Sequence, residues 1–233
     1  MKIVNVITHA FVGDLNHPAS NSRSIWMTRE GTLLQLVDEL GNVGQGEASP
    51  LPDFSTDLPG LCETTLGNLE PSSFPVFDIT GDVLAQVQQS LSLVDLNAPA
   101  ARFALETALL DLFGQRLDVP IAALLRSRPH RDPIALSSVI FSEDKIGALA
   151  ETEAIWERGI RNVKIKIGRI HRFDRELEMI EAVRERFGKD LAIRADVNGA
   201  WDLIEAQEKL EALTPFDLEY VEQPVVPYLL LKL

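Results

Sequence analysis

The amino-acid sequence predicts an α/β protein in two parts, an α+β unit over residues 1–125 and a unit of parallel strands over residues 126–233. Two observations support this fold class. In the first part, strand-like apolar runs precede one long amphipathic stretch. From about residue 132, four short apolar runs alternate with amphipathic helices, the pattern of parallel strands joined by helical crossovers.

The first part is predicted to begin with strands and to end with a helix. Residues 2–11 (KIVNVITHAF) indicate a strand, and residues 32–47 indicate strand, turn and strand with the reversal at residues 38–42. Residues 98–117 predict an amphipathic helix. Its apolar stripe comprises Leu105, Ala108, Leu109, Leu112 and Leu117.

Two segments rich in proline, serine, asparagine and aspartate are predicted as long loops, HPASNSRS at residues 17–24 and ASPLPDFSTDLPG at residues 48–60. Long loops in compact domains are often lids over a binding site. The nearby glycines at 41, 44 and 46 do not indicate a nucleotide loop, because no helix follows them.

The second part is predicted to alternate strand and helix with short connections. The strands are expected at residues 133–140, around 163–167, at 191–197 and at 218–224, and the helices at residues 142–159, 172–188 and 202–213. Ser142 is the predicted N-cap of the first helix, and Asp202 with Glu205 predicts a capping box for the third. The strands recur about every 27–30 residues, which fits one unit of an eightfold barrel of about 250 residues; a doubly wound sheet would give similar spacing.

The composition indicates an acidic globular protein of the cytoplasm. A net charge of −13, from 35 acidic and 22 basic residues, argues against a nucleic-acid partner, since binding to phosphates needs concentrated Lys and Arg. Cys62 is the single cysteine, so an intrachain disulfide is excluded and a reducing compartment is favoured. The sequence shows neither a convincing signal peptide nor an apolar run long enough to span a bilayer.

Three consecutive predicted strands carry charged residues where their apolar runs end. Lys164 and Lys166 lie in the second strand, Asp196 ends the third, and Glu222 ends the fourth. Singly, such a lysine is often an exposed edge residue and such an aspartate a turn former. The carboxyl ends of parallel strands build the active sites of α/β proteins, so four charges at equivalent positions favour a functional site.

The residue types indicate proton abstraction next to a carboxylate. Two carboxylates, Asp196 and Glu222, are hard oxygen ligands that suit Mg²⁺ or Mn²⁺ better than zinc. A metal ion and the neighbouring Lys164 would both lower the pKa of Lys166 towards that of a usable base. A divalent ion beside a neutral lysine can stabilise the enediolate that forms as the lysine takes the proton.

The motifs KIKIG, ADVNGAW and VEQP, in this order and spacing, resemble the enolase superfamily in its muconate-lactonizing subgroup. The resemblance implies that Lys166 is the acid/base and Lys164 its electrostatic partner. It implies that Asp196 and Glu222 are the first two of three Mg²⁺ ligands, with Asn198 supporting them. It also implies an N-terminal capping domain at residues 1–125 whose loops close over a small carboxylate substrate, followed by a β/α barrel.

Within this subgroup, GEASPLPDFS and RFALETALLDL are most similar to the o-succinylbenzoate synthases. That similarity implies dehydration of a cyclohexadiene carboxylate bearing a succinyl group, a step towards menaquinone or phylloquinone. The sister activities of N-succinylamino acid racemase, dipeptide epimerase and muconate cycloisomerase stay open as alternatives.

The chain ends eleven residues after Glu222, at residue 233. The family pattern has a third carboxylate on the fifth barrel strand and an opposing lysine on the sixth. Residues 126–233 are therefore expected to form a truncated barrel of about four strands with impaired activity and open edges that permit self-association. A non-catalytic half barrel that serves as a binding or assembly module is the competing hypothesis. No nucleic-acid or membrane partner is expected.

Overall fold

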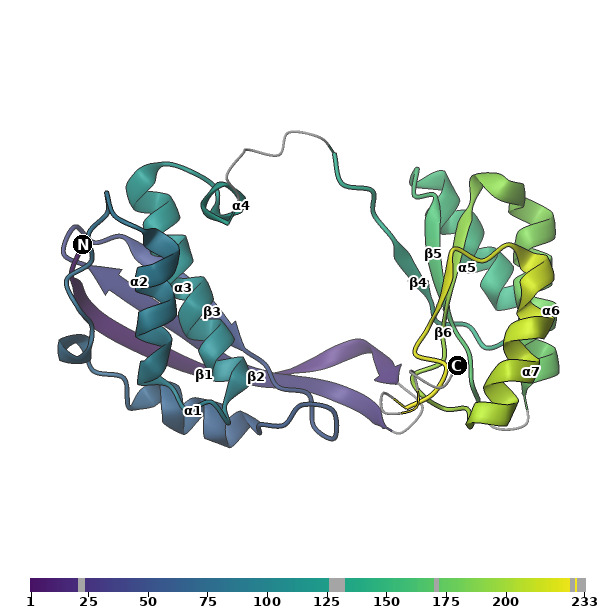
Figure 1. The fold of residues 1–233 in the computed structure, drawn as a ribbon, viewed down its shortest axis with the longest axis horizontal. Coiled ribbons are helices and arrows are strands. Elements are labelled where there is room, and N and C mark those ends of the chain that lie inside the picture. Colours follow the sequence, from purple (N-terminus) through teal and green to yellow (C-terminus); the bar gives the residue numbers. More distant parts are fainter. Residues whose placement is uncertain (21–23, 126–132, 170–171, 227–228, 230–233) are drawn as a thin grey trace. The chain divides into compact units, whose positions relative to one another are not determined.

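The computed structural model of the chain is shown in Figure 1. It describes residues 1–20, 24–125, 133–169, 172–226 and 229. The chain contacts separate two compact units. The first unit comprises residues 1–19 and 24–131, and the second comprises residues 20–23 and 132–233.

The first unit contains a three-stranded sheet in the order β1-β2-β3. Its strands are β1 (Ile3–Ser20), β2 (Ile25–Asp38) and β3 (Val43–Ala48), with β2 and β3 antiparallel. The predicted strand–turn–strand is confirmed. The prediction of a loop from residue 17 is wrong for residues 17–20, which belong to β1, while residues 21–23 lie outside the described chain. Pairing overrides local turn propensity there, and β1 is an edge strand, where proline is tolerated.

Helices cover one face of this sheet (Figure 1). The helices of this unit are α1 (Pro59–Gly67), α2 (Val83–Ser90), α3 (Pro99–Leu117) and α4 (Ile121–Leu124), with short 3₁₀ turns at Pro71–Ser73 and Leu91–Leu93. Helices α1 and α3 contact the sheet, and α2 and α4 pack against α3. The predicted long helix is confirmed as α3. Four of its five stripe residues are fully buried, whereas Leu117 is 36% exposed.

Two glycines of β3 allow α3 to lie directly on the sheet. A Cβ atom on Gly44 would be 2.1 Å from the Ala108 carbonyl oxygen, and one on Gly46 would be 1.9 Å from the Ala104 carbonyl oxygen. Those distances are too short for any side chain, so only glycine fits at either position. Gly44 and Gly46 therefore allow the close packing of α3 on the sheet. This role agrees with the interpretation of the sequence, in which these glycines do not indicate a nucleotide loop.

The second unit is a four-stranded parallel sheet in the order β4-β5-β6-β7. Its strands are β4 (Ser138–Ile140), β5 (Asn162–Lys166), β6 (Ala192–Asp196) and β7 (Tyr220–Glu222). The connecting helices are α5 (Lys145–Glu157), α6 (Phe173–Phe187) and α7 (Leu203–Leu213), with 3₁₀ turns at Gly188–Asp190 and Thr214–Phe216. This alternation confirms the predicted α/β fold class.

The helix starts of the second unit confirm one predicted cap and correct another. The capping box of Asp202 and Glu205 is present at α7. The N-cap of α5 is Asp144, whose side chain accepts hydrogen bonds from the Ile146 and Gly147 amides, so the assignment of Ser142 is wrong. The Ser142 hydroxyl instead donates to Glu151.

The core of the second unit lies on the aliphatic face of β5. Val163, Ile165 and Ile167 are at most 5% exposed and belong to one buried cluster with Ile180 and Val183 of α6. Because side chains alternate along a strand, Lys164 and Lys166 occupy the opposite face. Within the described ranges, none of the helices is both long and apolar enough to cross a membrane.

Candidate metal and proton-transfer site

The strand register places three of the predicted site residues in one row. Lys166 of β5 is paired with Asp196 of β6, and Asp196 is paired with Glu222 of β7. Directly paired residues of neighbouring strands point to the same face of a sheet. Lys164 lies two residues before Lys166 and therefore shares this face.

The two carboxylates of this row converge on one cation. The Lys164 Nζ atom lies 2.9 Å from Asp196 Oδ2 and 2.9 Å from Glu222 Oε2. The Asp196 side chain is 4% exposed, that of Lys164 24% and that of Glu222 44%. The two carboxylates from adjacent strands therefore share a single ammonium group at the carboxyl end of the sheet.

The two lysines of β5 differ in their electrostatic surroundings. Burial alone would lower the pKa of Lys164, but hydrogen bonds to Glu222 and Asp196 outweigh burial and raise it above its ordinary value. Burial also lowers the pKa of Lys166 and, although the negative charge of Asp196 opposes this, the positive charges of Lys164 and Arg169 reinforce it. The pKa of Lys166 is thus shifted downward, and the neighbouring Lys164 contributes to that shift.

A backbone hydrogen bond just past the end of β6 holds the Asp196 carboxylate in place. The Asn198 amide donates to Asp196 Oδ1 at 3.1 Å, so Asn198 contacts the predicted ligand through its main chain. Asn198 and Gln223 both have positive φ angles, of 52° and 43°. Left-handed conformations in residues other than glycine cluster at functional sites, since the surrounding structure has to enforce them.

Two residues near Lys166 were not identified from the sequence. Glu176 of α6 is 4% exposed and accepts hydrogen bonds from the Gly168 and Arg169 amides, both at 3.0 Å. Arg169 Nη1 donates to the Lys166 carbonyl oxygen at 2.9 Å. Together they hold the loop that leaves β5. The sequence signal for Glu176 was its place in the first turn of α6, the helix that follows β5. The helix dipole favours a negative charge at that position.

The donor set fits a hard divalent cation. Asp196 and Glu222 already direct one oxygen each at a common cation, and carboxylate oxygens are the ligands that Mg²⁺ prefers. Among the described residues, no group of three or more His, Cys, Asp or Glu side chains is placed to hold one ion. The described part of the chain therefore offers two carboxylates that could hold such an ion.

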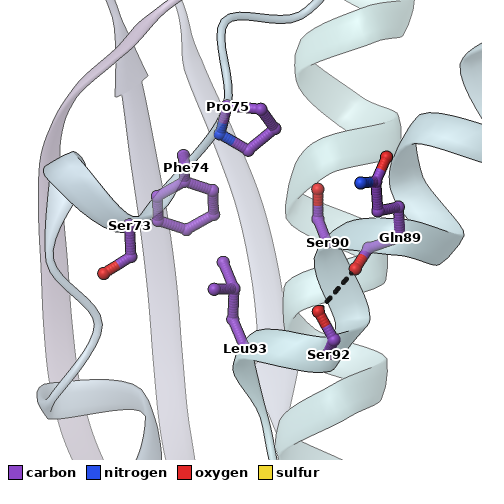
Figure 2. A pocket seen from close by; sticks show the side chains of 7 residues that line it. All are labelled: Ser73, Phe74, Pro75, Gln89, Ser90, Ser92 and Leu93. Carbon is purple, nitrogen blue, oxygen red and sulfur yellow. Dashed lines mark hydrogen bonds between the residues drawn. The ribbon is translucent and has the colours of Figure 1, made fainter.

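A cavity of about 310 Å³ lies elsewhere, in the first unit between the turn at Pro71–Ser73 and the end of α2. Figure 2 shows Phe74, Pro75 and Leu93 among its walls, with the Ser92 hydroxyl donating to the Gln89 carbonyl oxygen at 2.8 Å. The described residues that line it carry no ionisable side chain. Its described lining residues therefore offer no carboxylate, imidazole or amine for proton transfer or metal binding.

The loop predicted at residues 48–60 is confirmed as irregular structure at residues 49–58, whereas residue 48 ends β3 and residues 59 and 60 begin α1. Its first residues are fastened to β2, because the Trp26 indole donates to the Pro52 carbonyl oxygen at 3.0 Å. Phe54 is 69% exposed. Closure of this loop over a substrate stays a prediction.

Comparison with known proteins relates this chain to one superfamily. Residues 147–232 match the family described as enolase C-terminal domain-like. An N-succinyl-L-Arg/Lys racemase of Bacillus cereus is 25% identical over 97% of this chain and 60% of its own length. An o-succinylbenzoate synthase of Desulfotalea psychrophila is 30% identical over 89% of this chain and 61% of its own length.

A solved structure has the same fold. The dipeptide epimerase of Methylococcus capsulatus, complexed with Mg and the dipeptide L-Arg-D-Lys, superimposes with a TM-score of 0.83 at 24% identity, over 97% of this chain and 62% of the epimerase chain. The chain thus spans about three fifths of the length of these relatives. The resemblance to the enolase superfamily and the fold class inferred from the sequence are both confirmed.

Proposed function

We propose that this chain, whose residues 147–232 belong to the enolase C-terminal domain-like family, carries part of an active site that removes the α-proton of a carboxylate substrate with the help of Mg²⁺. The observation that carries the proposal is the row of Lys166, Asp196 and Glu222 across three paired strands. Register pairing at the carboxyl ends of parallel strands brings the proposed base and the two proposed metal ligands to one rim.

Lys166 is the proposed base. Burial and neighbouring positive charges lower the pKa of its ammonium group, which increases the neutral fraction that can accept a proton. The Arg169 contact to its carbonyl oxygen and the Glu176 contacts to the following loop hold the end of β5. Lys166 would thereby meet the substrate from a fixed position.

Asp196 and Glu222 would hold the divalent ion, and Asn198 would keep Asp196 oriented through its amide. When bound, Mg²⁺ would stabilise the negative charge that develops on the substrate carboxylate as the proton leaves. Mn²⁺ has the same ligand preferences and is the expected substitute.

The proposed reaction is dehydration of the o-succinylbenzoate synthase type, a step towards menaquinone or phylloquinone. The synthase of Desulfotalea psychrophila, at 30% identity, supports this choice. Racemisation of an N-succinylamino acid is the second candidate, because the Bacillus cereus racemase matches 97% of the chain. Both reactions begin with removal of a proton next to a carboxylate, so the same residues would serve either.

We further propose domain roles and a location. The first unit would be the capping domain, and the second would contribute the first four strands of the β/α barrel. The proposed location is the cytoplasm, in agreement with a single cysteine, Cys62, that is a buried thiol.

The test is exchange of the substrate α-proton with D₂O, followed by NMR with purified protein and Mg²⁺. Three substrates are compared: the succinylated cyclohexadiene carboxylate, an N-succinylamino acid and a dipeptide. We expect exchange with at least one of them, and loss of that exchange in Lys166→Met. Aromatic absorbance then reports dehydration, and inversion of configuration reports racemisation.

The matched control is Lys189→Met, because the Lys189 side chain is 86% exposed and pairs with a surface aspartate, Asp217. Exchange should persist in this variant. Undiminished exchange in Lys166→Met would assign the base to another residue. Absence of exchange with all three substrates, while Mg²⁺ still binds, would favour the non-catalytic binding module.

A further inference from the structure

We infer that Lys164 is an internal cation that occupies the place between Asp196 and Glu222 in the metal-free protein and competes with the divalent ion for these carboxylates. The inference rests on the proposed function, since it concerns the same two ligands. It assigns to Lys164 a role in metal affinity, in addition to its electrostatic effect on Lys166.

The geometry is that of a bridging cation. One nitrogen atom lies 2.9 Å from an oxygen of each carboxylate, although the carboxylates belong to different strands. Neighbouring strands lie about 4.8 Å apart, so the two negative charges would repel each other strongly without a cation between them. Asp196, at 4% exposure, has little water to compensate its charge. Lys164 supplies the missing charge.

Two other cations near this face, Arg194 and Arg169, form ion pairs with other carboxylates. Arg194 is the register partner of Lys164, but its guanidinium lies 2.6 Å from Glu219 Oε2. The Arg169 Nε atom lies 3.1 Å from Glu143 Oε1. Lys164 is therefore the cation whose ion pairs bridge the two proposed ligands.

Binding of a divalent ion to these oxygens is opposed by the Lys164 ammonium group in its present position. Mg²⁺ binds carboxylate oxygens at about 2.0–2.1 Å, well inside the 2.9 Å contacts made by the ammonium group. An ammonium group left roughly 4 Å from the ion would repel it even at a solvent-like dielectric constant. Metal binding therefore requires the Lys164 side chain to leave its present position.

The experiment compares metal affinities of the whole chain without substrate. Mn²⁺ binding is measured from the electron paramagnetic resonance signal of the free ion, and Mg²⁺ binding by calorimetry. Lys164→Met keeps the side-chain length and removes the charge, so we expect affinity to rise about tenfold or more. Lys164→Arg keeps the charge and should bind no more tightly than wild type. The Lys189→Met control, which loses a distant exposed charge, should match wild type.

The outcomes separate this inference from the proposed function. Equal or weaker binding by Lys164→Met, with wild-type binding intact, would overturn the inference and leave the metal site standing. Absence of binding in every variant would refute the metal site itself, and the inference with it.

A measurement on the wild-type chain keeps the inference testable if a variant does not fold. With lysines labelled with ¹³C at Cε, addition of Mg²⁺ should shift the Lys164 resonance and leave that of Lys189 in place. An unchanged Lys164 resonance at saturating Mg²⁺ would overturn the inference.

Discussion

Two clusters of opposite charges, one in each unit, differ in what neutralises their carboxylates. In the first unit, Asp38 is 1% exposed, and its oxygens accept hydrogen bonds at 2.9 Å from the Leu40 and Asn42 amides, the Asn42 side chain and Arg116. In the second unit, Asp196 accepts one backbone hydrogen bond, from Asn198, and shares Lys164 with Glu222.

The difference separates a structural carboxylate from an exchangeable one. Main-chain amides of the turn donate hydrogen bonds to the Asp38 side chain. Loss of these hydrogen bonds would therefore destabilise the turn. Asp196 and Glu222 are neutralised mainly by a side chain, which can move away when another cation arrives. By this criterion Asp38 maintains the fold, whereas Asp196 and Glu222 are available to a ligand.

The largest expected effect is on metal binding. The double variant Asp196→Asn, Glu222→Gln removes both anionic ligands, and we expect Mg²⁺ affinity to fall at least about 100-fold because neutral amides compensate the charge of the ion poorly. Titration calorimetry measures it. Glu205→Gln, on α7, is the control and should bind like wild type. Equal binding by the double variant would refute the ligand assignment.

The second effect is on folding. Asp38→Ala leaves the turn amides and Arg116 without their acceptor, and we expect it to lower the free energy of unfolding by roughly 3 kcal/mol. Glu222→Ala removes a carboxylate that is 44% exposed and should cost less than about 1 kcal/mol. Urea denaturation measures both. Similar losses in the free energy of unfolding for the two variants would contradict the distinction between a structural and an exchangeable carboxylate.

The third prediction applies the same criterion within the second unit. Glu176 is buried and accepts two backbone hydrogen bonds, so it resembles Asp38 rather than Asp196. Glu176→Gln keeps one acceptor oxygen, and we expect a loss of about 1–2 kcal/mol in the free energy of unfolding with unchanged Mg²⁺ affinity. A large change in affinity without a change in stability would assign Glu176 to the metal site instead.

The smallest expected effect is a pH dependence. Burial alone would raise the pKa of Asp38, but hydrogen bonds from Asn42, Arg116 and Leu40 outweigh burial and lower it. Its stabilising contribution is therefore complete above the unfolded pKa of about 3.9 and is lost as the pH falls through the lower folded value. The stability difference between wild type and Asp38→Asn should shrink between pH 6 and pH 2. A constant difference would contradict this.

The row of Lys166, Asp196 and Glu222 was predictable because strand alternation and the common edge of parallel strand ends are properties of the backbone. The bridging position of Lys164 was not, since it depends on which rotamer a long side chain adopts between two carboxylates. Helices α1 and α2 were missed because they are short, nine and eight residues long, and the apolar spacing of α1 is weak. The cap of α5 was misplaced by two residues because Ser142 and Asp144 are both capping residue types.

The backbone contacts beyond β6 and β7 have a consequence for how this site can evolve. The Val197 amide donates to the Glu222 carbonyl oxygen at 3.1 Å, the Gly199 amide to that of Gln223 at 2.7 Å and the Trp201 amide to that of Pro224 at 3.3 Å. Main-chain bonds therefore set the spacing of positions 196 and 222, whichever side chains stand there. Selection or design can exchange these side chains for a different ligand pair, such as histidines for a softer metal, while the frame that presents them stays in place.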